Sequence, residues 1–192
     1  MAMSDGRARR AARSRAAIED ALYALIGEGV LQPTMQEVAA RAGVALRSVF
    51  RHFSDMEGLF ASLDARLRME ALPLLHAPDL TTSLRDRIHA LVRQRARVFE
   101  RIAPYKRSAD VQRARSPFIQ SQQALFVDEL RARLQGWLPE LAEASADVQE
   151  AVELVLSLEA WERLRVAQRL GRTRAIQVME RTAAALLCGE RP

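Results

Sequence analysis

The chain has 192 residues, of which 49% are hydrophobic and 28% are charged. This length and composition fit one compact unit or two small ones that share a core, and they exclude a multi-domain machine, a disordered chain and a fibrous repeat. Only 24 residues are β-branched (13 Val, 6 Ile and 5 Thr), which is too few for a protein built on sheets. We therefore predict an all-α protein.

Several classes of function are disfavoured by what the sequence lacks. The single cysteine, Cys188, excludes an internal disulfide, and the three histidines show no metal-ligand spacing. No Ser-His-Asp signature or Gly-rich phosphate loop is present either. No run approaches the roughly 20 apolar residues that span a bilayer. We expect a cytoplasmic protein that is not an enzyme, holds no cofactor or metal, and has no membrane partner.

The net charge of +5 is concentrated at the N-terminus. Residues 1–15 carry five arginines against one aspartate, whereas residues 16–60 carry three arginines against six acids. We expect residues 1–13 to form a basic disordered arm, and Arg13 and Arg15 to contact a DNA backbone or minor groove. The alternative is a solubilising tail without contacts.

The first two predicted helices are marked by periodicity and by capping. Apolar residues recur at helical spacing over residues 14–27. Thr34 and Glu37 then form a capping box, in which the hydroxyl accepts from the third backbone N–H and the carboxylate reaches back. A second helix is predicted over residues 35–42.

A glycine turn joins this helix to the next one. Gly43 can adopt positive φ without strain, and a third helix is predicted over residues 45–52. A second capping box, Ser54 with Glu57, predicts a long fourth helix that ends near Leu72.

The remaining chain predicts five more helices, for about nine in all. Proline or glycine marks most of their ends, and Pro104 in particular separates two of them. The predicted ranges are 84–102, 105–115, 117–136, 148–170 and a last helix from 173.

The last two predicted helices are more apolar than one chain's core requires. Small residues in the final helix would let another helix approach closely. We therefore predict a homodimer. Its interface is expected to contain Val152, Val155, Trp161, Ile176, Met179, Ala183 and Leu187.

The third helix has a polar outward face. With Leu46, Val49, Phe50 and Phe53 anchored inside, the outward residues form two i, i+4 stripes, and two arginines repel each other on one of them. A major groove would relieve that repulsion, because Arg pairs with guanine O6 and N7 and with phosphates. The alternative is an ordinary solvated face. The predicted outward residues are Arg47, Ser48, Arg51 and His52.

Residues 15–60 resemble the N-terminal helix-turn-helix domain of the tetracycline-repressor (TetR) family. The resemblance is most specific at TMQEVAARAGV and at the RHF that follows, and weaker at SLEAWERLR and RTAAALLCG near the C-terminus. It implies that the third helix reads DNA and that the fourth links the DNA-binding domain to a ligand domain. It also implies that the last two helices form a homodimer's four-helix interface.

Three positions depart from the family's habit. Phe50 stands where Tyr is usual, Met56 where Lys is usual and Ala45 where Ser is common, and each change removes a habitual phosphate contact. The expected organisation is an arm (1–13), a three-helix DNA-binding domain (14–60) and a helical ligand-binding and dimerisation domain (61–192). The expected DNA contacts are Arg13, Arg15, Thr34, Arg47, Ser48, Phe50, Arg51 and His52.

The expected function is that of a ligand-responsive transcriptional regulator, a repressor that leaves a palindromic double-stranded operator when a small molecule binds. The alternative is an all-α small-molecule-binding or interaction module whose DNA binding is weak and non-specific. A ligand site in such a protein lies between helices. Its candidate residues are Leu67, Leu72, Leu91, Phe99, Tyr105, Gln122, Phe126 and Trp161, with Gln123 or His89 as further polar anchors.

Overall fold

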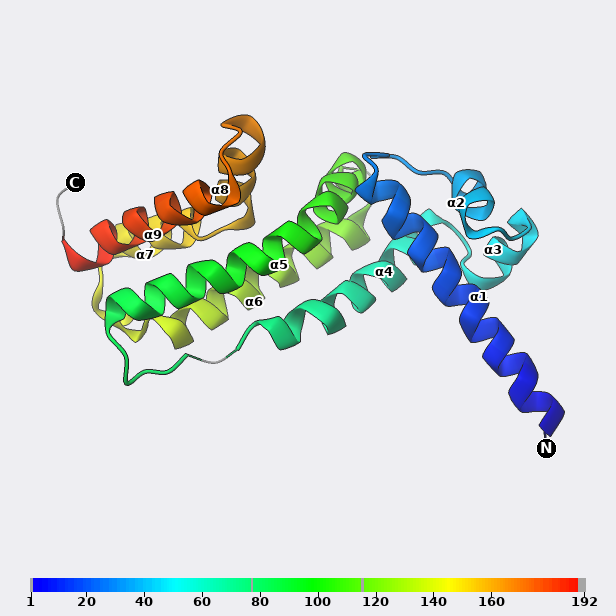
Figure 1. Ribbon diagram of the computed structural model, residues 1–192, viewed down its shortest axis with the longest axis horizontal. Helices are drawn as coiled ribbons and strands as arrows, with labels where there is room; N and C mark the ends of the chain where they lie inside the picture. The colour runs from blue at the N-terminus through cyan, green and yellow to red at the C-terminus, as the bar shows by residue number, and fades with distance from the viewer. Residues whose placement is uncertain (1, 77, 115, 190–192) are drawn as a thin grey trace. The chain divides into compact units, whose positions relative to one another are not determined.

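The computed structural model describes residues 2–76, 78–114 and 116–189, and for residues 2–5, 7 and 72 it describes the backbone alone. The described part is helical and contains no strand, which confirms the all-α prediction (Figure 1). The helices are α1 (Ala2–Gly27), α2 (Met35–Ala42), α3 (Leu46–His52), α4 (Met56–Ala71), α5 (Leu84–Arg113), α6 (Pro117–Trp137), α7 (Ala146–Val155), α8 (Leu158–Glu162) and α9 (Arg172–Cys188).

The helices form two compact units. The first unit comprises residues 1–70 and 104–121, and the second comprises residues 71–103 and 122–192. The helices α4, α5 and α6 therefore contribute residues to both units. A single cut at residue 60 does not describe this division, because 104–121 belong with the N-terminal helices.

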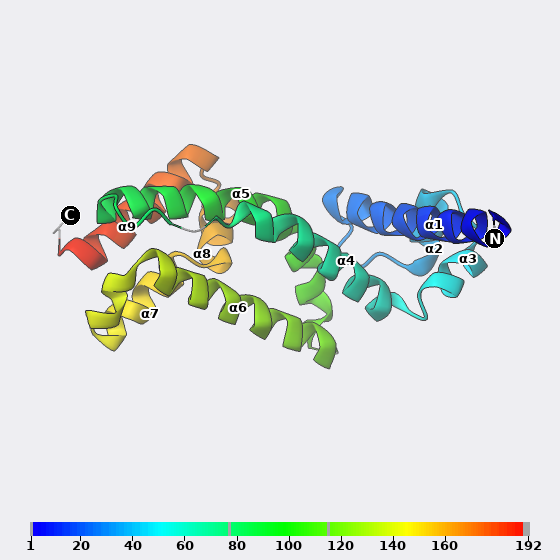
Figure 2. The same ribbon diagram turned by 90° about the horizontal axis from the view of Figure 1, so that it is seen from below.

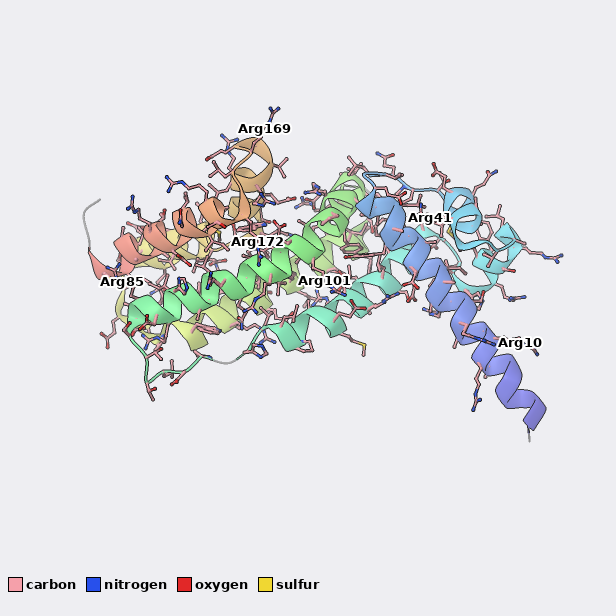
Figure 3. All side chains as sticks on the ribbon, in the orientation of Figure 1. Arg10, Arg41, Arg85, Arg101, Arg169 and Arg172 are labelled. Carbon is pink, nitrogen blue, oxygen red and sulfur yellow. The ribbon has the colours of Figure 1, made fainter. Side chains whose placement is uncertain are left out.

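Helix α1 begins at Ala2, so residues 2–13 of the expected disordered arm are helical in the structure, and residue 1 lies outside the described residues. The segment contains no proline, and alanine and arginine, which predominate in it, are both strong helix formers. High local propensity thus extends the amphipathic part of α1 by more than three turns. Arg10 projects from this extension (Figure 3).

The first unit is held together by a core drawn mainly from α1 to α4, to which Tyr105, Ala109 and Ile119 add from α5 and α6. Its most buried members include Ile18, Leu22, Val38, Val49 and Phe60, each with no exposed surface. The spacing of these residues places them on the inner faces of their helices. The core therefore fixes which side of each short helix remains in solvent.

Helix α4 is capped by Asp55 and not by the predicted pair of Ser54 and Glu57. The Asp55 Oδ1 accepts from the Gly58 backbone N–H at 2.7 Å. Ser54 donates to the Asp55 carboxylate. The Glu57 carboxylate accepts a hydrogen bond from the Ser116 hydroxyl instead of reaching back along its own helix. A tertiary contact thus overrides the local pattern.

Helix α5 runs through Pro104, although the sequence predicts an end before it. A proline inside a helix removes one backbone hydrogen bond and crowds the preceding turn. Here both neighbours are buried, Ala103 in the second unit's core and Tyr105 in the first unit's core. Packing on both sides of Pro104 outweighs the local cost.

The segment 148–170 is not one helix, as the sequence predicts, but two helices and a π-helical turn. The first, α7, ends at Val155, and Ser157 caps α8 by accepting from the Ala160 N–H at 3.1 Å. The π-helical turn Arg163–Ala167 follows α8. Serine favours helix N-termini because its hydroxyl satisfies a free backbone N–H there. The apolar periodicity hid this break.

Helices α7 and α9 pack against each other in the second unit (Figures 1 and 2). This packing corrects the predicted dimer interface. Four of its seven residues, Val152, Trp161, Met179 and Ala183, are at most 1% exposed in the single chain and belong to its own core. The other three are partly buried: Val155, Ile176 and Leu187.

No helix in the described part of the chain is both long enough and apolar enough to cross a bilayer. Among the same residues, no group of His, Cys, Asp or Glu side chains is arranged to hold a metal ion.

Candidate nucleic-acid interface and ligand cavity

The helix-turn-helix is fixed at both ends of α2. Its predicted capping box is confirmed, since Thr34 Oγ1 accepts from the Glu37 N–H at 3.2 Å and the Glu37 carboxylate accepts from the Thr34 N–H at 2.7 Å. Gly43 ends the helix at φ 67°, in the left-handed region that glycine favours. The Thr34 hydroxyl also donates to Glu37, so its hydrogen-bonding capacity is largely used within the motif.

Helix α3 presents two arginines to solvent. Arg47 and Arg51 are exposed, and neither guanidinium makes a hydrogen bond or ion pair with any residue that the structure describes. Ser48 lies beside them and is partly buried. The two charges sit at i and i+4, where like charges destabilise a helix by about 0.2–0.5 kcal/mol. The face is therefore an uncompensated cationic surface.

Phe50 belongs to this exposed surface and not to the core. Its side chain is 51% exposed, and Leu46 is 39% exposed, so the prediction that both anchor the helix is wrong. Val49 is the one buried residue within α3, with Phe53 buried at its C-terminal cap. A helix of only seven residues has about two turns, so burying more of its residues would leave fewer exposed. Phe50 consequently offers an apolar ring beside the two guanidinium groups.

His52 ends the exposed face in a partly buried position. Its Nε2 atom is buried and has no hydrogen-bond partner among the described residues. Burial lowers the pKa of His52, and the positive charges of Arg51 and Arg15 lower it further. The lowered pKa favours the neutral imidazole, which can accept or donate a hydrogen bond without adding charge.

Arg15 and Arg13 are in different situations on α1. The Arg15 guanidinium lies over the Phe53 ring at 4.5 Å from its centroid and donates to Ser62 Oγ at 2.7 Å. Arg15 also pairs with Glu19 at 3.4 Å. Arg13 is exposed. Arg15 therefore holds the first unit together, whereas Arg13 remains available to an external anion.

Three contacts that the sequence did not predict attach residues 104–121 to α4 and to the loop that precedes α2. Tyr105 donates to the Phe60 carbonyl at 3.2 Å, and Ser108 donates to the Leu31 carbonyl at 2.8 Å. Ser116 adds its bond to Glu57. The partners are 45 to 77 residues apart in the chain, so no local spacing could signal them.

The predicted ligand-pocket residues do not gather in one place. Leu67 and Tyr105 belong to the first unit's core, where burial and the neighbouring Asp64 raise the Tyr105 pKa far above its usual value. The remaining candidates belong to the second unit or its edge. Leu91, Phe99 and Trp161 are buried in its core, Gln122 and Phe126 are partly buried, and the side chain of Leu72 lies outside the described residues.

Phe126 lines a cavity of about 370 Å³ in the second unit. The cavity lies among α5, α6, α7 and the start of α8, and its apolar wall includes Leu130 and Leu158. Arg95 of α5 also lines it. A cavity of about 590 Å³ lies farther along α6 and α7, where its lining includes Leu134, Leu138 and Gln149. The first cavity has the size and mixed lining of a small-molecule site.

Comparison with known proteins agrees with this architecture. Residues 17–63 match the family model described as bacterial regulatory proteins, tetR family. A search of curated proteins found no match to the chain.

Solved structures share the fold along nearly the whole chain. A transcriptional regulator from Rhodococcus sp. Rha1 is 20% identical with a TM-score of 0.70, covering 93% of this chain and 99% of its own. SmeT in complex with triclosan is 16% identical with a TM-score of 0.59, covering 90% of both chains. The multidrug-binding protein EbrR with imidazole is 18% identical with a TM-score of 0.56, covering 88% of this chain and 93% of its own.

The matched segment 17–63 spans α2, α3 and the turn between them, where the exposed cationic face was found. TetR-family proteins are DNA-binding regulators and not enzymes. Residues 17–63 thus match the tetR family of bacterial regulatory proteins, and the chain shares the fold of solved transcriptional regulators.

Proposed function

We propose that the protein is a repressor that binds a palindromic operator as a homodimer and leaves it when a small molecule binds the second unit. The observation that carries the DNA-binding part is the outer face of α3, where Arg47 and Arg51 are exposed and without partners in the described chain. A major groove supplies the acceptors that this face lacks. Such a regulator acts where the DNA is, which places it in the cytoplasm.

The proposed contacts keep most of the residues expected from the sequence. Arg47 and Arg51 reach base edges or phosphates, Ser48 and His52 add neutral hydrogen bonds, and Phe50 offers an apolar surface to a thymine methyl or sugar. Arg13 joins them from α1. Thr34 and Arg15 contribute by fixing the positions of α2 and α3.

The dimer is proposed from the apolar surface that remains on α7 and α9. Val155, Ile176 and Leu187 are partly buried in the single chain. Sedimentation at micromolar concentration should give twice the chain mass of 21.5 kDa. A species of 21.5 kDa alone would contradict the dimer.

The effector part of the proposal is supported by the cavity and by the ligand-bound neighbours. Two proteins of the same fold, SmeT and EbrR, were solved with triclosan and imidazole. Because α4, α5 and α6 contribute residues to both units, a ligand that favours one arrangement of the second unit biases the first through these helices.

Fluorescence anisotropy with the DNA upstream of the protein's own gene tests DNA binding. The double variant Arg47→Ala with Arg51→Ala should lose at least tenfold in affinity and show a shallower salt dependence, since each lost phosphate contact reduces the slope by about 0.9. Arg93→Ala with Arg97→Ala is the matched control. Those two residues are also exposed arginines at i, i+4 spacing without partners among the described residues.

Equal losses in the two double variants would contradict a specific role for α3. The alternative function, an interaction module with non-specific DNA binding, predicts equal affinity for the upstream fragment and for unrelated DNA of the same length. The exposed Phe50, in place of the family's usual Tyr, is the observation that favours this alternative.

A further inference from the structure

Arg95 is a charged residue inside the core of the second unit. It is 2% exposed and lies on the buried side of α5, between the exposed Arg93 and Arg97. Its guanidinium donates through Nη1 to the Leu156 carbonyl at 2.6 Å and through Nη2 to the Leu130 carbonyl at 2.7 Å. Among the described residues, no carboxylate forms an ion pair with it. Arg95 is thus hydrogen-bonded but not neutralised.

Burial lowers the pKa of Arg95 to about 10, so the side chain keeps its charge at neutral pH. A buried charge without a counterion destabilises a protein, and an apolar side chain of similar size would pack the same space without this cost. The two carbonyls satisfy hydrogen-bond donors but bring no net negative charge. Arg95 is therefore costly to the fold unless an anion joins it.

The 370 Å³ cavity gives an anion a route to Arg95. Arg95 lines the cavity together with the apolar side chains of Phe126, Leu130 and Leu158. Val127 and Leu154 also line it and are 36% and 66% exposed, so they mark its opening. The cavity thus joins a buried cation to an exposed apolar rim.

The other charged groups of the cavity do not neutralise Arg95. Arg131 is paired with Glu153, to which its Nε donates at 2.7 Å. Glu153 attracts Arg95 electrostatically but forms its ion pair with Arg131. Glu150 and Glu159 also line the cavity and are exposed, and Glu159 accepts from Gln123 at 3.3 Å. The unpaired acids therefore lie in solvent, whereas the unpaired base is buried.

We propose that this cavity binds an amphipathic monoanion, whose carboxylate pairs with Arg95 while its apolar body lies along Phe126, Leu130 and Leu158. The inference rests on the proposed function, because it names the chemical class of the effector. The exposed Glu150 and Glu159 repel an anion held at the opening, which favours the orientation with the carboxylate inside. A neutral or cationic amphiphile lacks the counterion that Arg95 needs.

Calorimetric titration of the full chain with three probes of equal chain length tests the class. Decanoate, decan-1-ol and decyltrimethylammonium, each below its micellar concentration, differ in head-group charge. We expect decanoate to bind at least tenfold more tightly than either of the others, in line with a charge-assisted hydrogen bond. Equal binding of decanoate and decan-1-ol, or tighter binding of the cation, would overturn the proposal.

Two sets of variants locate the site. Arg95→Met should abolish the preference for decanoate over decan-1-ol, and an unchanged preference would refute the role of Arg95. Val127→Trp at the opening should weaken decanoate binding at least tenfold. Leu125→Trp, a matched exposed position on the same helix that does not line the cavity, should leave it unchanged. If Arg95→Met fails to fold, this second pair and the head-group series decide.

The same decanoate titration in the anisotropy assay separates this inference from the proposed function. Decanoate that binds the protein but leaves its complex with the upstream DNA intact would support the cavity and contradict ligand-driven release. Failure of the protein to bind the DNA would contradict the proposed function and leave the calorimetric result standing. Absence of decanoate binding by a DNA-binding protein would overturn the inference alone.

Discussion

Replacing Arg15 by alanine should destabilise the first unit, although Arg15 is not part of the exposed face of α3. The Arg15 guanidinium lies over the Phe53 ring, donates to Ser62 and pairs with Glu19. Phe53 is the C-terminal cap of α3 and is 3% exposed. The contacts with Phe53 and Ser62 therefore connect α1 to the end of α3 and to α4, whereas the pair with Glu19 lies within α1.

The expected loss in the free energy of unfolding is about 1–2 kcal/mol. A cation–π contact contributes about 0.5–1 kcal/mol at an accessible site. The Arg15 side chain is 48% exposed, so its ion pair with Glu19 and its bond to Ser62 are screened by solvent and together add no more than about 1 kcal/mol. The loss is small enough for the unit to remain folded in water.

Urea unfolding followed by two probes measures this loss. Both tryptophans, Trp137 and Trp161, lie in the second unit, so tryptophan fluorescence follows that unit, whereas far-UV circular dichroism follows all helices. Arg15→Ala should lower the circular dichroism midpoint more than the fluorescence midpoint. Arg13→Ala, which removes an exposed arginine from the same helix, is the control and should move neither. Equal stability of the two variants would refute the structural role of Arg15.

Three further sets of variants, each measured by urea unfolding, test the cap of α4, the turn at Gly43 and the protonation of His52. Asp55→Ala should lower the free energy of unfolding by about 1 kcal/mol, because α4 loses its cap, whereas Ser54→Ala should lower it much less. A larger loss for Ser54→Ala would instead support the predicted capping box of Ser54 and Glu57. Gly43→Ala should lower the free energy of unfolding by about 1–2 kcal/mol, because alanine is strained at a φ of 67°. Gly136→Ala, inside α6, should raise it by about 0.5–1 kcal/mol, because alanine favours a helix more than glycine does. If both variants changed the stability in the same direction, the role of positive φ at Gly43 would be contradicted. The lowered pKa of His52 means that the unfolded chain binds the extra proton first, so stability should fall as pH drops from 7.5 to 5.5. His52→Gln should lessen that fall, and an unchanged slope would show that other groups cause it.

The parts of the fold that depend on local signals could be predicted from the sequence. The capping box at Thr34, the turn at Gly43 and the exposed arginines of α3 all follow from residues within a few positions of one another. The division at Ser157 and the continuous α5 through Pro104 could not be predicted in this way. Both depend on packing against residues that are far away in the chain, and the spacing of apolar residues within one helix does not indicate which residues those are.

The site divides in the same way. The outward position of Arg47 and Arg51 follows from helical spacing around Val49. The position of Arg95 is different, because helical spacing puts a charged residue on the buried side of α5, between Val92 and Phe99. A polar residue at a core position conflicts with the pattern around it. In the absence of a packing reason, such a conflict indicates a functional position.

Helix α3 shows why the structural contacts of Arg15 and the proposed DNA contacts belong together. A helix of seven residues is far too short to be stable alone, and α3 buries only Val49 within its length. Its position therefore depends on contacts at its ends, where Gly43 sets the turn before it and Arg15 covers Phe53 after it. Fixing the helix from its ends leaves Arg47, Phe50 and Arg51 free to face a partner. A loss of Arg15 should thus weaken DNA binding through the position of α3, and Arg15→Lys, which keeps the charge but not the planar group over Phe53, should restore that binding only in part.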